Sequence, residues 1–118
     1  MVKASKTLTI TESTSQSYTI GIPDFPPSMA ANSTSRFTVR IKPALQSSAT
    51  VNIVFTKGSD VVKRSFSANQ SSGTITSTSQ EIDYNVQAPS VIGQYDLYAE
   101  LVVGSSTYKS QNYVMQVY

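Results

Sequence analysis

The sequence contains no cysteine, no histidine and no tryptophan. Without cysteine, neither a disulfide framework nor a thiolate metal site can form. Without histidine, the Ser-His-Asp and Cys-His catalytic arrangements and all histidine-containing metal motifs are excluded. The five glycines are scattered and form no phosphate-binding loop. We therefore expect a protein that is not an enzyme and that uses neither a cofactor nor a metal.

Charge is also scarce. Charged residues make up 14% of the chain, against roughly 25% in typical soluble domains. The net charge of +2 is too small to indicate binding to nucleic acid or to an anionic membrane. No apolar run approaches the roughly 20 residues of a membrane-spanning helix. Residues 1–5 include one lysine but no apolar core, so they do not predict a signal peptide.

Serine and threonine, at about 28% of the residues, take the place of charge. A β domain with many hydroxyl groups and few charges is typical of cell surfaces and virions, although all-β proteins in general tend toward the same composition. We therefore expect an extracellular, cell-surface or virion location. The length of 118 residues is that of one domain, so residues 1–118 are expected to form a single unit.

Short segments in which apolar and polar residues alternate recur along the chain, and no segment predicts a helix. The clearest runs from Gly93 to Leu101, where Tyr95, Leu97 and Ala99 share one face with Leu101. Further strands are expected at residues 6–11, 18–22, 36–42, 50–56, 61–67, 81–87 and 107–118, with a short one around Ile75. About seven to nine short strands predict an antiparallel β-sandwich.

Three local features refine this pattern. The proline-rich residues 24–33 predict a loop or a crossing between sheets, because proline cannot donate to a sheet ladder. Residues 61–67 predict an edge strand, because Lys63 and Arg64 would discourage pairing with another sheet. The last segment has two competing sets of inward residues, which a β-bulge at residues 110–112 would reconcile.

Residues 82–97, IDYNVQAPSVIGQYDL, carry a resemblance to a known family. An alternating strand, then Ala88-Pro89, then Gly93-x-Tyr95-x-Leu97 resembles the E-to-F region of immunoglobulin-like sandwiches. It is most similar to the cysteine-free ones of bacterial and archaeal surface proteins, including cell-adhesion-related and fibronectin-type-III-like modules. The resemblance implies an immunoglobulin-like β-sandwich in which Tyr95 is a tyrosine corner, its hydroxyl bonded to backbone a few residues upstream.

The region before residue 36 leaves the topology open. Two strand candidates and a proline-rich loop precede the expected second strand of an immunoglobulin-like domain. They fit either a first strand that is split in two or a jelly-roll-like sandwich.

The charged residues favour structural roles. The pairs Glu81/Asp83 and Asp96/Glu100 occupy outward positions of regular strands, as solvated surface charge does. Arg36, Arg40 and Lys42 form a basic stripe on a strand that is expected to pair with the one carrying Glu81, Asp83 and Asn85. We expect cross-strand ion pairs between the two sets, each contributing roughly 0.2–1 kcal/mol.

Exposed aromatic residues are the best functional signal. Tyr98 points away from the core face of its strand, Phe25 lies in the proline-rich loop, and Tyr118 ends the sequence. Tyrosine on a flat sheet face is typical of protein interfaces and of sugar-stacking platforms. Phe25, Tyr98 and Tyr118, with Asp96 and Glu100 beside Tyr98, are therefore the candidate interface.

Two N-glycosylation sequons, at Asn32 and Asn69, fall in expected loops and matter only if the protein is exported.

These features favour a non-catalytic structural or interaction module of a cell-surface or virion assembly. Its partners would be other protein subunits or domains, including further copies of itself, with no nucleic acid and no insertion into a membrane. One alternative is a carbohydrate-binding module that uses Tyr98 as a platform. Another is a pilus-type subunit whose N-terminal residues 6–22 add a strand to a neighbour's sheet.

Overall fold

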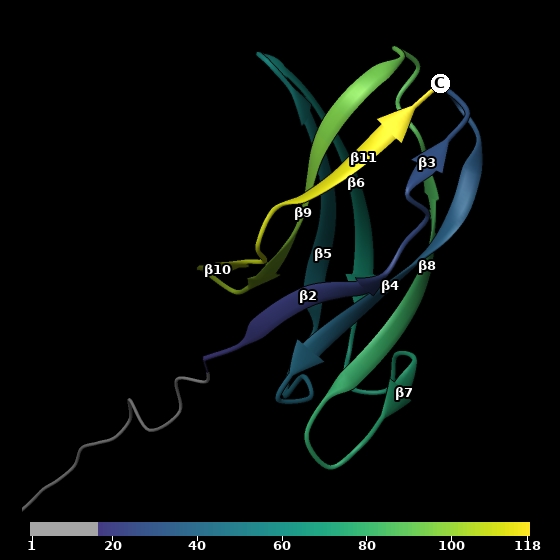
Figure 1. The fold of residues 1–118 in the computed structure, drawn as a ribbon. Helices are drawn as coiled ribbons and strands as arrows, with labels where there is room; N and C mark the ends of the chain where they lie inside the picture. The colour runs from purple at the N-terminus through teal and green to yellow at the C-terminus, as the bar shows by residue number, and fades with distance from the viewer. Residues whose placement is uncertain (1–16) are drawn as a thin grey trace, which may run out of the picture.

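A computed structural model describes residues 17–118, which contain ten strands and no helix. The strands form two sheets that pack face to face (Figure 1). The smaller sheet contains, in order, β2 (Thr19–Asp24), β4 (Thr34–Lys42), β8 (Gln80–Gln87) and β7 (Thr74–Ile75). The larger contains β3 (Ser28–Met29), β11 (Tyr113–Val117), β9 (Gly93–Val103), β5 (Ala49–Lys57) and β6 (Asp60–Ala68), with β10 (Ser106–Lys109) also paired to β9.

The prediction of an all-β sandwich is confirmed, and its strand order is that of an immunoglobulin-like domain. The order β2-β4-β8-β7 corresponds to strands A, B, E and D, and β11-β9-β5-β6 continues it as G, F, C and C′. A jelly roll orders its strands differently. The strand count exceeds the predicted seven to nine because the first and last strands are each divided in two. The strand expected at residues 6–11 lies outside the described residues.

The first strand crosses from one sheet to the other. β2 pairs with β4 in the smaller sheet, and the chain then passes Pro26 and Pro27 to β3, which runs parallel to β11 in the larger sheet. The prolines interrupt backbone pairing where the crossing occurs. The crossing and the split first strand are therefore confirmed.

The last strand contains the expected bulge. Lys109 lies opposite Glu100 and Tyr113 lies opposite Leu97, so residues 110–112 face only residues 98–99 of β9. Ser110 holds the bulge, since its backbone N–H donates to the Ala99 carbonyl (2.9 Å) and its Oγ accepts from the Ala99 N–H (2.8 Å). The extra residue reverses the alternation. Tyr108 and Tyr113 therefore both pack against the core, together with the buried Met115 and Val117.

The core is a chain of aromatic rings between the two sheets. Phe37 of β4 and Phe55 of β5 meet edge to face, with ring centroids 6.2 Å apart, and Phe55 meets Tyr95 of β9 at 6.2 Å in the same manner. All three side chains are fully buried. The inward residues expected from alternation are buried around them: Val39, Ile41, Val51, Ile53, Ile82, Val86, Leu97, Ala99 and Leu101.

Gln80 is a buried polar residue that holds two loops together. Its Oε1 accepts from the Leu45 N–H (2.8 Å), and its Nε2 donates to the carbonyls of Asn69 and Ser72 (2.8 Å each). Since burying an amide is costly unless its hydrogen bonds are made, these three contacts explain how a glutamine is tolerated at the end of the core.

Tyr95 forms the contact that the resemblance implied. Its hydroxyl donates to the carbonyl of Val91, four residues upstream, at 2.6 Å. The bond ties the loop before β9 to the core, because the ring itself is buried against Phe55.

The variant Tyr95→Phe is expected to lose about 1 kcal/mol of unfolding free energy, the usual net contribution of one intramolecular hydrogen bond. Urea denaturation measures the change. Tyr118→Phe is the matched control, because the Tyr118 ring is exposed. A Tyr95→Phe variant as stable as the control would contradict a stabilising role for the hydroxyl.

Gly73 and Gly58 form a second matched pair. Both have positive φ (+63° and +61°), a backbone conformation that is unfavourable for any L-residue. Only at Gly73 would an added Cβ also collide with backbone, at the Glu81 carbonyl oxygen. Gly58→Ala is expected to cost about 1–2 kcal/mol for the dihedral alone, and Gly73→Ala several times more. Thermal unfolding of both variants tests this, and equal losses would contradict the close approach of residue 73 to β8.

Candidate interaction surface

The outer face of the larger sheet carries three of the predicted interface residues. Because Tyr95, Leu97 and Ala99 face the core, Asp96, Tyr98 and Glu100 project from the opposite side of β9. The three side chains form a row along one strand at the centre of the sheet.

Glu100 belongs to a fixed polar network across β9, β5 and β6. Its Oε1 accepts from Asn52 Nδ2 (3.3 Å) and lies 3.7 Å from Lys63 Nζ. Asn52 Oδ1 in turn accepts from the Ser65 hydroxyl (2.7 Å), and Asn52 is only 6% exposed. These bonds join three strands, so Glu100 has a structural role on this face.

Tyr98 is covered on one side of its ring. Lys109 Nζ lies 4.2 Å from the ring centroid, a cation–π distance. Val54, directly opposite Tyr98 in the register, is fully buried although it lies on the outer face. The outer face therefore has a small apolar layer at its centre.

A row of directly opposed residues crosses the same face. Val114, Asp96, Thr56 and Val61 lie side by side on β11, β9, β5 and β6. Val114 is 57% exposed and Val61 is 61% exposed, whereas Thr56 is half-buried. The row thus presents two exposed apolar side chains with a carboxylate between them, a pattern that sequence alternation alone did not reveal.

The two other predicted interface residues lie elsewhere. The ring of Phe25 is partly buried, 5.4 Å from that of Tyr113 and 6.1 Å from that of Phe37. The expectation of an exposed Phe25 is therefore wrong, because the crossing strand brings its ring between the sheets. Tyr118 is 66% exposed and follows Val117, which lies opposite Gly93; Val91 and Ile92, just before Gly93, are also exposed. The structure does not bring the five residues together.

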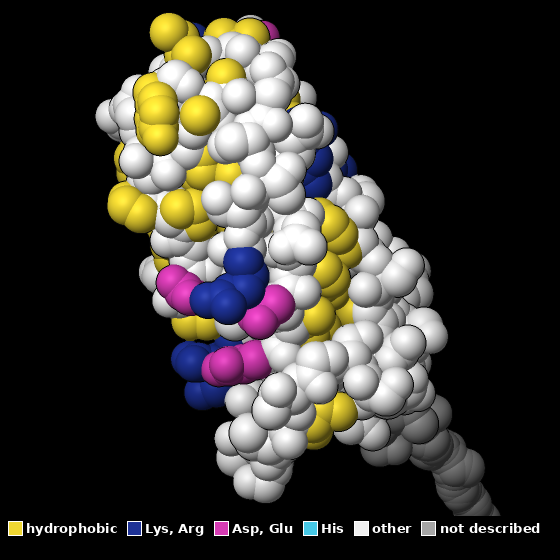
Figure 2. Space-filling model, turned by 90° about the vertical axis from the view of Figure 1, so that its right-hand side faces the viewer, with side chains coloured by type: hydrophobic (Ala, Val, Ile, Leu, Met, Phe, Trp, Pro, Cys, Tyr) yellow, Lys and Arg dark blue, Asp and Glu magenta, His cyan; other side chains and the backbone are white. Residues whose placement is uncertain are grey.

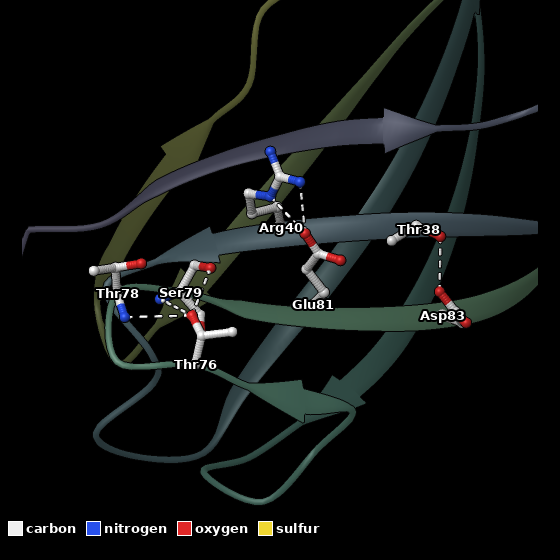
Figure 3. Close-up of polar contacts among 7 residues, drawn as sticks. All are labelled: Thr38, Arg40, Thr76, Thr78, Ser79, Glu81 and Asp83. Atoms are coloured by element: carbon white, nitrogen blue, oxygen red, sulfur yellow. Dashed lines mark hydrogen bonds and ion pairs between the residues drawn. The ribbon is translucent and has the colours of Figure 1, made fainter.

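The outer face of the smaller sheet is electrically balanced. Figure 2 shows basic and acidic side chains interspersed on the face that it presents. Arg40 pairs with Glu81 (2.6 Å), as predicted, while Asp83 accepts from the Thr38 hydroxyl (2.7 Å; Figure 3). The register explains the difference, since Thr38 and not an arginine lies opposite Asp83. Arg36, opposite Asn85, lies 3.7 Å from Asp24.

A hollow of about 290 Å³ opens beside β2, lined by residues 19–23 with Arg40, Lys42 and Tyr113. Gly21 leaves the space, and the Tyr113 hydroxyl, which accepts from the Ile22 N–H (3.0 Å), lies beside it. Within residues 17–118, no group of three or more acidic side chains gathers as a metal site would require, and no helix is long and apolar enough to cross a membrane.

Side chains close the side of the sandwich that lies between β6 and β8, which we call the β6–β8 side. Phe66 of β6 stacks on Tyr84 of β8 with ring centroids 4.5 Å apart, and the Tyr84 hydroxyl donates to the Ser67 carbonyl (3.2 Å). Arg64 Nε donates to the carbonyl of Gln87 (3.0 Å). β6 is an edge strand, as predicted, but Arg64 does not guard that edge, because its guanidinium is engaged by β8.

No known protein-family model matches this sequence, and a comparison with curated proteins found no similar one.

Burial raises the pKa of the Tyr84 hydroxyl from 10.0 to about 12. A raised pKa in the folded state means that stability is complete below pH 10 and declines as the pH rises from 10 toward 12. Tyr84→Phe is therefore expected to lose less stability than the unmodified protein across that interval. Urea denaturation at several pH values measures it, with Tyr118→Phe as the control, and parallel curves for Tyr84→Phe and the unmodified protein would contradict the assignment.

Proposed function

We propose that this chain is a non-catalytic, immunoglobulin-like structural or interaction module of a cell-surface or virion assembly, and that it acts through protein–protein contacts. The observation that carries the proposal is the row across the larger sheet, in which Val61 and Val114 are exposed on either side of Asp96. Non-obligate protein interfaces are about as apolar as the rest of a protein surface and combine apolar with polar groups, as this row does.

The rest of the outer face supports the same use. The Glu100 network and the Lys109–Tyr98 contact hold long side chains in place, so less side-chain entropy is lost when a partner binds. The hydroxyl-rich composition and the resemblance of residues 82–97 to prokaryotic surface modules support the location, and the Tyr95–Val91 hydrogen bond agrees with that resemblance.

Binding of a carbohydrate on Tyr98 has less support. One face of the ring is occupied by Lys109, so a sugar would have to displace the ammonium group or use the other face.

Self-association of the full chain tests the proposal. Size-exclusion chromatography with light scattering, from about 10 μM to about 1 mM, covers the range of weak interfaces. We expect an increase in molar mass that Val114→Lys shifts to at least tenfold higher concentration, because a charge at the apolar end of the row must be desolvated. Ser48→Lys, the same charge change at an exposed loop residue, should have no effect.

A chain that stays monomeric throughout, or equal effects of the two lysine variants, would contradict a self-contact through this face. A glycan array on the unmodified protein and on Tyr98→Ala is the accompanying measurement. Glycan binding that Tyr98→Ala abolishes would favour the carbohydrate alternative instead.

A further inference from the structure

The smaller sheet ends in an incomplete strand. β7 pairs only with Gln80 and Glu81 of β8. Along the rest of that sheet edge, residues 82–87 of β8 have no partner strand among the described residues. A run of this length without a partner strand offers backbone donors and acceptors over roughly 20 Å, at about 3.4 Å per residue. Its last carbonyl, that of Gln87, already accepts from Arg64 Nε (3.0 Å).

The sequence stops β7 at both ends. At its start, Gly73 has a positive φ and lies against the Glu81 carbonyl, while the Asn69 carbonyl accepts from the Ser72 N–H (3.2 Å) in the turn before it. At its end, Thr76 Oγ1 accepts from the backbone N–H groups of Thr78 (3.3 Å) and Ser79 (3.0 Å), which closes a tight turn into β8 (Figure 3). Because β7 is antiparallel to β8, the turn at its start is the one that leaves residues 82–87 without a partner strand, with a gap beside them, while the turn at its end joins it to Gln80.

The surroundings of the gap suit an added strand with one apolar and one polar face. On the inner side lie the stacked rings of Phe66 and Tyr84 and the side chain of Val62, all only partly buried. On the outer side Asp83 and Asn85 are exposed. Alternate residues of an added strand would meet these two environments in turn.

Residues 6–11 of the chain, Lys-Thr-Leu-Thr-Ile-Thr, have that alternation. Leu8 and Ile10 share one face, and Thr7, Thr9 and Thr11 the other. They belong to the 18 residues that precede β2, which forms the edge of the smaller sheet opposite to β7. A strand that leaves one edge and pairs at the other makes a head-to-tail contact, which joins subunits into a closed ring or an open chain.

We propose that residues 6–11 of one copy add as a strand to the free edge of β8, residues 82–87, of a second copy. The proposal rests on the proposed function, because it names another copy of this chain as the partner. It adds a contact by strand addition at β8, separate from the one on the outer face of the larger sheet.

The absence of cysteine allows a direct test by cross-linking in the full chain. A Thr9→Cys variant is mixed with an Asn85→Cys variant and treated with a short bis-maleimide. The expected product is a dimer joining the two variants, in several-fold higher yield than from Thr9→Cys mixed with Ser48→Cys. Adding Leu8→Lys and Ile10→Lys to the donor should reduce the yield to that of the control.

Equal yields from Asn85→Cys and Ser48→Cys would overturn the proposal. So would cross-linking only within one copy of a Thr9→Cys/Asn85→Cys double variant, since the segment would then complete its own sheet. If Val114→Lys weakens self-association while the donor variant does not, and cross-linking is unspecific, the proposed function stands and strand addition fails. If neither variant alters self-association and cross-linking is unspecific, both fail.

Discussion

The contact of Phe37 in the smaller sheet with Phe55 in the larger one, where Phe55 also meets Tyr95, is the interaction on which the rest of the structure depends. The chain has no cysteine and no tryptophan, so neither a disulfide nor an indole can join its sheets. Three fully buried rings in edge-to-face contact occupy that place. Aromatic pairs of this geometry contribute about 0.5–1.5 kcal/mol each beyond the area that they bury.

The same reliance on aromatic and polar side chains continues at both sides of the sandwich. Phe25 and Tyr113 close the side at β2 and β11. On the β6–β8 side, the same is done by Phe66, Tyr84 and Arg64. The second closure is made by side chains of β6 and β8 and not by a strand, and β7 pairs only with the start of β8, so the backbone beyond it has no partner strand among the described residues. The turns that end β7 and the amide of Gln80 hold this arrangement, which connects the packing of the core to the way in which copies would assemble.

Much of the fold followed from alternation and turn residues. Where one face of a strand is buried, a shift by one residue would move every apolar side chain into water. Leu97 and Phe37 could therefore be assigned inward, the Arg40–Glu81 pair could be anticipated from strand pairing, and the bulge at residues 110–112 was required by two conflicting patterns. The contributions of Phe25, Arg64 and Val54 could not be predicted in this way. Their environment comes from strands distant in the sequence. The crossing from β2 to β3 places Phe25, the approach of β8 to β6 engages Arg64, and Val54 is buried on the outer face where β5 lies beside β9.

The sequence by itself determined the class of the domain, the inward faces of its strands and the position of Tyr95, because these depend on local periodicity and on residues with narrow backbone or packing preferences. Only the tertiary structure decided which surfaces remain available. Exposure of Val61 and Val114 in one row depends on the register of four strands, and the free edge of β8 depends on the turn that precedes β7 and on the Gln80 amide that donates to it. Both are outcomes of contacts between distant segments, which no local pattern specifies.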